Sequence, residues 1–576
     1  MKIILYLLGL LSILVSCTNN LDIKPTNMIS EEDVKNDPVL VDAFLNKVYF
    51  LTRFDASAGT YAYQPATFNV ISGEQNVKAA WQAPFQAAMQ IIDENGARKI
   101  EDGQMDYWPY DNIRSANEIL QILKESTFDK NFVIQKTAEA RFLRAFMYFE
   151  LVKRYGGVPL ITTPQSIDQP IEELNVKRNS EKEIYDFIGS EMDELANILP
   201  NSYSASSFGR PTKWAAYALK SRAMLYAGSI AKYSTVQLNG ILGIPAGDAN
   251  NYYQKSYDAS MQVINNSPHA LYRKNSDPVK NYNEIFVKDG NSEVIFAVVY
   301  DKPLLKTHYW NYVCTPEEFS TGWGSNNWYY LESFEKYEYQ DGSSGKLDWS
   351  QLNGVTKFSL KDLILKKDPR FLASAWYPES PWQGGKIYFH SGTIGTIPAG
   401  STWPAVARPR NKANTGFLVR KRVNEAVVLT PVPEDETDWI VFRTGEMYLN
   451  AAEAAFERNN EPEARKQLNI IRERAAMPPK SLLTIDDIRN ERFVELFIEG
   501  HRYWDLRRWR IAVKELNGKG FKGVTWMYYI NEDKYTLQIK DGDFGFIRTF
   551  AERNYYFPIS KSRLAENPNL VENPGY

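Results

Sequence analysis

Cysteine and histidine are scarce in this chain of 576 residues. It has two cysteines, Cys17 and Cys314, and four histidines that lie far apart in the sequence. Two cysteines cannot form the disulfide framework of a small secreted domain, and the histidines do not follow the spacing of a zinc site. No base is placed near Cys314 to activate it, so we expect a buried, apolar residue there. Neither a metal ion nor a cofactor is predicted.

Motifs of several enzyme classes are missing as well. There is no GxxxxGK[ST] loop, no GxGxxG, no GxSxG elbow and no HExxH. The formal net charge of −3 does not suggest a nucleic-acid partner. A glycosidase needs only two carboxylates across one bond, and the chain has 70 acidic residues. A secreted glycoside hydrolase therefore stays open as an alternative, while the missing motifs favour a non-enzymatic protein.

One hydrophobic run, Ile3 to Val15, follows the single charge of Lys2. It is too short for a stable membrane span and is typical of a signal peptide. A small residue, Ser16, precedes Cys17 as in a bacterial lipobox. We therefore expect residues 1–16 to be removed, Cys17 to be acylated and residues 17–37 to form a tether. The alternative, an ordinary secretory signal, would leave Cys17 as an odd free thiol near the terminus of an exported protein.

Apolar residues at helical spacing predict a mostly α-helical protein. Ser180 and Glu183 form a capping box, and Gly228 is expected to end the helix that begins near Arg210. Small residues at the contact positions of paired helices suggest tetratricopeptide-like hairpins. The helices are predicted at residues 38–53, 83–124, 137–155, 180–199, 210–226, 250–266, 442–457 and 463–475. Residues 55–81 are expected to form an exposed loop system.

The stretch from Thr484 to Arg510 combines a capping box with an acidic stripe. Glu491, Glu495 and Glu499 repeat every four residues, which is unfavourable unless cations answer them. We expect the arginines of residues 502–510 to do so. A metal site at Glu495, Glu499 and His501 is the alternative, and it is disfavoured because one histidine beside five arginines is a poor cage for a cation.

Two arginines, Arg141 and Arg144, lie inside the apolar helix predicted at 137–155. They could form an anion site, but buried guanidinium groups are usually paired with acids. We therefore expect them to pair with buried acids such as Glu139 or Glu150.

Tryptophans gather in residues 303–403, among glycine, serine and asparagine rather than on a helical pattern. They are Trp310, Trp323, Trp328, Trp349, Trp376, Trp382 and Trp403. The apolar face of a sugar ring stacks on tryptophan or tyrosine, and loops with polar neighbours can supply its hydrogen bonds. Large loops also need a core of their own. Core filling is the better prediction for any single tryptophan, and ligand contact is the better prediction for at least one of the group.

Four segments resemble the SusD/RagB family of nutrient-binding outer-membrane lipoproteins. They are FLRAFMYFELVKRYGGVPL (142–160), FRTGEMYLNAAEAAF (442–456), ERFVELFIEGHRYWDLRRW (491–509) and NYYFPISKSRLAENPNLVENPGY (554–576). The resemblance implies a single SusD-like domain over residues 38–576. It would have a helical scaffold at about 38–270 and 438–515, a loop-rich insert with short strands at about 271–437, and a C-terminal segment at 516–576.

The same resemblance implies capture of an oligosaccharide at the cell surface, without turnover. The partners it implies are a SusC-like TonB-dependent transporter and the outer-membrane lipid that receives acylated Cys17. Family members bind ligand with loops from an N-terminal segment and from the insert, and by position the candidates here are Asn76, Trp81, Trp323, Trp328, Tyr329, Trp382 and Gln383. Capture of peptides is the alternative within the family.

Overall fold

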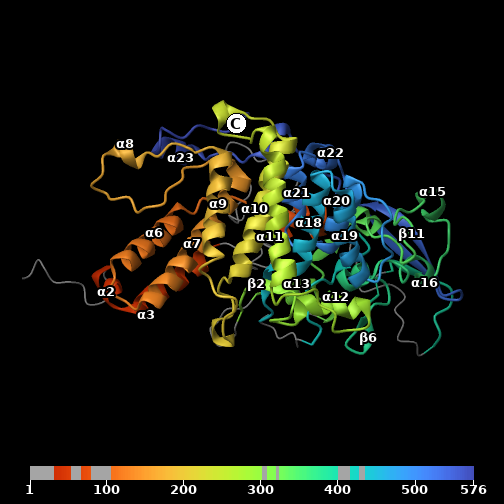
Figure 1. The fold of residues 1–576 in the computed structure, drawn as a ribbon. Helices are drawn as coiled ribbons and strands as arrows, with labels where there is room; N and C mark the ends of the chain where they lie inside the picture. The colour runs from red at the N-terminus through yellow and green to blue at the C-terminus, as the bar shows by residue number, and fades with distance from the viewer. Residues whose placement is uncertain are drawn as a thin grey trace, which may run out of the picture.

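The computed structural model describes residues 31–52, 66–78, 105–300, 308–319, 324–388, 390–399, 415–426 and 435–576. Most of its regular structure is helical and its strands are few and mostly short, as predicted (Figure 1). Within these ranges, no helix has both the length and the apolar character needed to cross a membrane.

The helical scaffold consists of two groups of helices. In Figure 1 the first group (red to yellow) lies on the left and in the middle, and the second (cyan to blue) on the right. The first comprises α2 (Glu31–Asn36), α3 (Pro38–Leu51), α6 (Tyr110–Glu125), α7 (Lys130–Tyr155), α8 (Ile171–Leu174), α9 (Glu181–Leu195), α10 (Lys213–Tyr233) and α11 (Ala249–Asn266). The second comprises α18 (Thr444–Glu457), α19 (Glu461–Arg474), α20 (Ile485–Glu495), α21 (Arg502–Arg508) and α22 (Ala512–Leu516).

Neighbouring scaffold helices pack against one another in a continuous series. α6 packs on α7, α7 on α9, α9 on α10, α10 on α11, α11 on α18 and α18 on α19. The contact between α11 and α18 joins the two groups across the insert. Ala215, Ala218, Ala451 and Ala455 are all buried, and their small side chains allow the helices to approach closely. This series is the tetratricopeptide-like scaffold that the sequence predicts.

Capping residues determine where two of these helices begin. At α9 the Ser180 hydroxyl accepts the N–H of Glu183, and the Glu183 carboxylate accepts the N–H of Ser180. Thr484 and Asp487 form the same reciprocal pair at α20. Each box satisfies N–H groups that have no partner within the helix, so both starts are confirmed.

Several helix boundaries differ from the prediction. The helix predicted at 83–124 is seen only from Tyr110, because residues 105–109 are described and are not helical. α7 begins earlier, at Lys130, because the Asp129 carboxylate accepts the first free N–H groups of the helix. α10 runs past Gly228, the predicted stop, to Tyr233. A Cβ atom at Gly228 would lie 2.9 Å from the ring of Tyr253 in α11. This glycine therefore lets two helices approach closely instead of ending one of them.

The insert between α11 and α18 carries short helices and most of the strands. Its helices are α12 (Pro278–Val287), α13 (Trp310–Cys314), α14 (Leu331–Glu335), α15 (Trp349–Leu352), α16 (Leu360–Leu363) and α17 (Pro369–Ser374). Its strands are β2 (Val294–Val298), β3 (Asn327–Tyr329), β4 (Ala375–Trp376), β5 (Pro381–Trp382), β6 (Gly385–Lys386), β7 (Gly392–Ile394), β8 (Leu418–Val419) and β9 (Trp439–Arg443).

Segments from both ends of the chain complete the sheets. β1 (Gln75–Val77), which follows α4 (Ala66–Ile71), gives the order β1-β3-β8-β4. β10 (Lys522–Tyr529) and β11 (Lys534–Asp541) form a sheet with β7, while β2 pairs with β9 and β5 with β6. The loop predicted at residues 55–81 thus contains a helix and a strand in its described part. The strand exists because it pairs with the insert, and no local pattern reports that pairing.

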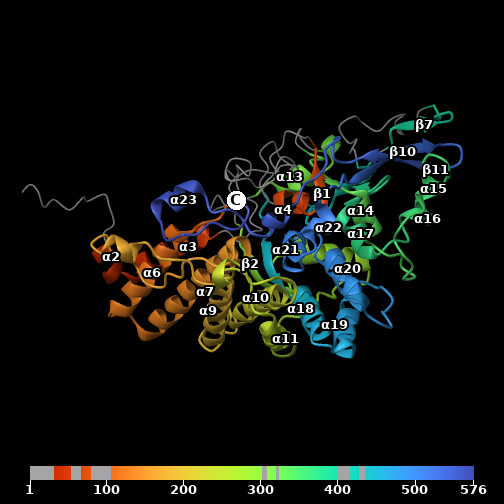
Figure 2. The ribbon, with the colours of Figure 1, turned by 90° about the horizontal axis from the view of Figure 1, so that it is seen from above.

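Two main hydrophobic cores follow this division. The larger one joins the first scaffold group to the C-terminal segment, including Phe557 and Ile559. The C-terminal helix α23 (Lys561–Glu566) returns to the N-terminal half (Figure 2), where Arg563 pairs with Asp106 at 2.8 Å. The second core joins the insert to α20 and to β10 and β11, and it is rich in aromatic rings.

Candidate functional site

The predicted ligand-binding segments meet where β1 pairs with β3. Asn76 of β1 lies opposite Trp328 of β3, although 252 residues separate the two in the sequence. The N–H of Lys78 extends this contact by donating to the carbonyl oxygen of Asn326 at 3.0 Å. The fold therefore brings the N-terminal segment and the insert together.

Asn76 and Trp328 use their polar groups inside the protein. Asn76 is fully buried: its Nδ2 donates to the Gly542 carbonyl oxygen at 2.6 Å, and its Oδ1 accepts the Val77 N–H at 2.8 Å. Trp328 is 4% exposed, and its Nε1 donates to the Ser325 carbonyl oxygen at 2.7 Å. The Asn76 side chain thus ties the N-terminal strand to the C-terminal segment, the Trp328 side chain bonds within the insert, and neither presents a free face to solvent.

Tyr329 and Trp382 lie in the core of the insert. The Tyr329 ring centroid is 4.4 Å from that of Phe497 and 5.6 Å from that of Phe371. Trp382 stands edge-on to Trp376 with centroids 5.4 Å apart. Both rings thus fill the core that the sequence offered as the alternative to ligand contact, because the loops around them have few aliphatic residues to bury. That they touch ligand stays a prediction.

Gln383 is the one predicted ligand contact in the described part of the chain whose side chain is exposed. It forms the β5–β6 turn with Gly384, and both residues have positive φ angles, of 43° and 85°. Its Nε2 donates to the Glu425 carbonyl oxygen at 3.1 Å. The hairpin is thus anchored to residues 420–426, which the sequence did not single out. Cys17, Trp81 and Trp323 lie outside the described residues.

The acidic stripe of α20 is paired, and Glu495 is its centre. Arg370 Nη1 lies 3.0 Å from Glu495 Oε2, Arg443 Nη1 lies 2.7 Å from Oε1, and Arg474 also binds Oε1. Burial alone would raise the pKa of Glu495, but Arg474, Arg443 and Arg370 outweigh it and hold that pKa well below its ordinary value.

Glu499 is held in the same way. Arg443 donates to both of its carboxylate oxygens at 2.7 Å, and Lys421 Nζ donates at 2.8 Å. Burial would raise the pKa of Glu499, but Arg443 and Lys421 lower it to about 2. Burial in turn lowers the pKa of Lys421 to about 8, although Glu499 opposes that shift. This closed network holds the scaffold and the insert together, because Lys421 belongs to the insert.

The partners of the acidic stripe are not those predicted. They come from α17, β9 and α19 rather than from residues 502–510, and they are Arg370, Arg443, Arg472 and Arg474. Arg508, one of the expected partners, instead binds Glu453 of α18. Helical spacing shows that an acid needs a cation, but it does not say which distant helix supplies one.

The same limit applies to Arg141 and Arg144. Both pair with Glu191 of α9, at 2.7 and 3.3 Å, instead of with Glu139 or Glu150 of their own helix. An ion pair rather than an anion site is confirmed, and the predicted partners are wrong.

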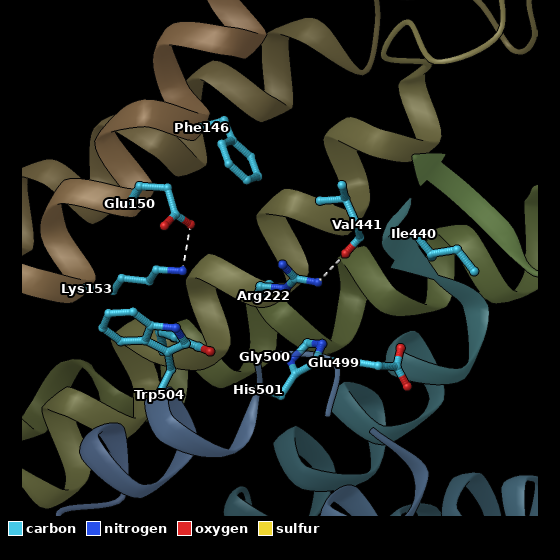
Figure 3. A pocket seen from close by; sticks show the side chains of 11 residues that line it. Phe146, Glu150, Lys153, Arg222, Ile440, Val441, Glu499, Gly500, His501 and Trp504 are labelled. Carbon is cyan, nitrogen blue, oxygen red and sulfur yellow. Dashed lines mark hydrogen bonds and ion pairs between the residues drawn. The ribbon is translucent and has the colours of Figure 1, made fainter. Parts of the chain in front are cut away.

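Two small cavities lie in the scaffold. The first is lined by Glu150, Lys153, Arg222, His501 and Trp504 among others (Figure 3) and offers about 30 Å³ to water centres; the second shares Lys153 and Trp504 and offers about 20 Å³. A single buried water needs roughly 10–15 Å³. Each cavity has room for only one or two waters and is too small for a sugar ring.

The described side chains contain neither a metal-binding cluster nor a reactive thiol. Within those ranges, no group of three or more His, Cys, Asp or Glu side chains is placed to hold a metal ion. Cys314 is buried, and burial raises the pKa of its thiol far above neutral pH, so it does not supply a thiolate.

Two family models match the chain. One, described as SusD family, matches residues 292–576, and the other, described as starch-binding associating with outer membrane, matches residues 19–225. Among curated proteins, a SusD-like protein of Bacteroides ovatus is 25% identical over 457 residues, covering 76% of this chain and 70% of the relative. SusD-like protein P38 of Formosa agariphila is 22% identical, covering 90% and 93%.

Solved structures share the fold. A SusD-like protein from Bacteroides fragilis superposes with a TM-score of 0.72 at 24% identity, covering 96% of this chain and all of the other. A SusD-like carbohydrate binding protein from the same species gives 0.69 at 20% identity, covering 93% and 99%. A laminarin binding SusD-like protein gives 0.61 at 20% identity, covering 94% and 100%.

Proposed function

Because this chain belongs to the SusD/RagB family, we propose that it captures oligosaccharides at the outer membrane without turning them over. The class of ligand is supported by the starch-binding description of the model that matches residues 19–225. It is also supported by two structural neighbours, the laminarin binding protein and a surface glycan-binding protein A from Bacteroides uniformis.

The observation that carries the proposal is the meeting of β1 and β3. Lys78 and Asn326 are hydrogen-bonded there, and Trp81 follows Lys78 by three residues while Trp323 precedes Asn326 by three. A second link, the ion pair of Lys78 with Glu317, crosses the same junction. The chain segments that lead to Trp81 and to Trp323 therefore start from neighbouring residues of the described structure.

The proposed site divides its candidates into two roles. Trp81, Trp323 and Gln383 contact the sugar, the rings by stacking and the amide by hydrogen bonds. The other candidates position these contacts, because they join the N-terminal strand to the insert or fill the core beneath the loops; they are Asn76, Trp328, Tyr329 and Trp382. Acylated Cys17 would anchor the protein, and a SusC-like TonB-dependent transporter would receive the ligand.

Isothermal titration calorimetry tests the proposal on a soluble form that begins at Thr18. Oligosaccharides and peptides are titrated into the wild type and into Trp81→Ala and Trp323→Ala. We expect glycan binding that falls at least about tenfold in each variant, equivalent to about 1.4 kcal/mol. Phe50→Ala is the matched control, since this aromatic ring of α3 is 73% exposed on the scaffold.

Three other outcomes would contradict parts of the proposal. Binding of peptides alone would favour peptide capture, and release of shorter sugars would favour a hydrolase. Glycan affinity that is equal in the wild type and both tryptophan variants would show that the site lies away from the β1–β3 junction.

A further inference from the structure

Arg422 is a buried arginine whose side chain makes no hydrogen bond and no ion pair with any residue that the structure describes. The residue is 4% exposed, and its Nε and Nη2 atoms are buried without a partner. Its guanidinium carbon lies 4.0 Å from the ring centroid of Trp439 and 5.5 Å from that of Phe286. These cation–π contacts offset part of the cost of burying the charge but satisfy none of the five N–H donors.

Every other buried arginine in the described ranges has at least one partner for its side chain. These are Arg144, Arg154, Arg178, Arg370, Arg443, Arg472, Arg474, Arg492, Arg502, Arg507, Arg508 and Arg548. Burying a charge without a partner is costly. Arg422 is therefore the exception among these buried arginines, and its unpaired guanidinium needs an explanation.

The backbone at Arg422 is also unusual. The Val423 N–H donates to the Arg420 carbonyl oxygen at 2.9 Å, which closes a turn with Arg422 at its third position and a φ of +67°. Glycine or asparagine is favoured at such a position. The conformation is imposed from both sides, by the bonds of Lys421 to Glu499 and of Asn424 to Asn311. Strain held in this way is typical of functional positions.

Other polar atoms around Trp439 are unsatisfied too. Trp439 Nε1 and Asp435 Oδ2 are buried and make no hydrogen bond. His308 packs on Trp439, and its Nδ1 lies 3.5 Å from Asp435 Oδ2. Burial lowers the pKa of His308; in the neutral ring Nε2 faces the Thr437 carbonyl oxygen at 2.8 Å and Nδ1 accepts the Trp310 N–H at 3.3 Å, so Nδ1 has no proton to donate to Asp435. The cluster therefore presents a cationic donor, an indole donor and a carboxylate acceptor at once, which suits a ligand that carries both an anionic group and hydroxyls.

The turn of Arg422 adjoins the proposed glycan site. Gln383 Nε2 donates to the Glu425 carbonyl oxygen, three residues beyond Arg422. Burial lowers the pKa of Arg422 to about 10 and the charge of Glu499 opposes that shift, but Glu499 forms its ion pairs with Arg443 and Lys421 and none with Arg422.

We propose that Arg422 binds an anionic group of the captured oligosaccharide, a carboxylate or a sulfate ester. The inference rests on the proposed function and names its substrate class as acidic glycans. A guanidinium offers two parallel N–H groups to either anion, and the pairing is strong where water is excluded. Neutral glycans of the same linkage lack this contact.

The test compares matched glycans by calorimetry on the soluble form. One pair is a uronic-acid oligosaccharide and its carboxyl-reduced counterpart, and the other is a sulfated oligosaccharide and its desulfated counterpart. We expect the wild type to bind the charged member of one pair at least about tenfold more tightly. Arg422→Gln should reduce that preference to less than about twofold while leaving the neutral member unchanged. Lys361→Gln, on an exposed lysine, is the control with the same change of net charge.

The outcomes separate this inference from the proposed function. Glycan binding without preference for charge in the wild type, or a preference that survives Arg422→Gln, overturns the role of Arg422 and leaves glycan capture standing. The absence of binding by any glycan overturns both.

A melting experiment without ligand distinguishes a binding role from a structural one. Arg422→Gln removes an unpaired charge, so the variant should melt at the same temperature as the wild type or higher. The charged glycan should raise the melting temperature of the wild type and not that of the variant. A melting temperature that falls by several degrees in Arg422→Gln would mean that the guanidinium supports the fold, which contradicts the proposal.

Discussion

Two buried arginines, Arg443 of the scaffold and Arg422 of the insert, have opposite surroundings, although another arginine of the insert, Arg370, is paired like Arg443. Arg443, at the start of α18, binds Glu293, Glu495 and Glu499 with its guanidinium. Arg422, in a turn of the insert, binds no acid. The ion pairs of Arg443 join segments of the scaffold that are distant in the sequence. In the insert, the unpaired guanidinium lies beside the proposed ligand site. We therefore assign the paired Arg443 a structural role and the unpaired Arg422 a role in ligand binding.

The two regions also differ in how they fill their interiors. Scaffold helices meet through alanines and a glycine, which lets their backbones approach closely. The insert instead relies on aromatic rings, such as Phe334 and Phe417, which stack with centroids 5.1 Å apart. Short strands and loops offer few aliphatic side chains to bury, so large rings do that work.

Removal of the Arg443 guanidinium should cause the largest loss of stability. In Arg443→Met, three buried acids lose a partner, and a broken buried ion pair costs about 3–5 kcal/mol. Urea unfolding of the soluble form measures the loss. Arg114→Met removes an exposed pair with Glu118 and should cost less than about 1 kcal/mol. Equal effects of the two substitutions would show that the network does not hold the scaffold.

Acid should weaken the scaffold network next. The pKa of Glu499 is lowered from 4.5 to about 2 in the folded protein. A depressed carboxyl pKa contributes stability that is complete above about pH 5 and is lost as the pH falls towards 2, in this case of the order of 3 kcal/mol. Glu499→Gln should therefore be less stable at pH 7 and should lose less between pH 5 and pH 3. Parallel pH profiles of the free energy of unfolding would contradict this.

The smallest effect on stability is expected at the tip of the β5–β6 hairpin. Gln383→Gly removes an exposed side chain with its hydrogen bond to the Glu425 carbonyl oxygen, but it also relieves a positive φ, so the free energy of unfolding should change by less than about 1 kcal/mol. Glycan affinity should nevertheless fall, because the proposed amide contact is lost. Unchanged affinity, measured by calorimetry, would remove Gln383 from the site.

The scaffold was largely predictable because its signals are local. Ser180 with Glu183 and Thr484 with Asp487 announce helix starts within four residues. Gly228 shows where a local signal fails. Glycine can end a helix or admit a neighbour, and only the position of Tyr253 decides between the two. The cations that pair with the acids of α20 could not be predicted for the same reason, since they come from other helices.

The insert was predictable in composition but not in detail. Its tryptophans could serve a core or a ligand, and the burial of Trp328 and Trp382 depends on strands that pair across long stretches of chain. Arg422 carried no signal at all, because neither its left-handed turn nor its lack of a partner is visible in the sequence.

Hydrogen–deuterium exchange of the soluble form, with and without the best-binding glycan, tests the division of labour most directly. The account predicts ligand protection of amides at the β1–β3 junction and the β5–β6 hairpin, residues 75–78, 324–329 and 381–386, with no change in α18 to α20. Protection confined to the scaffold helices, with the insert unchanged, would contradict it.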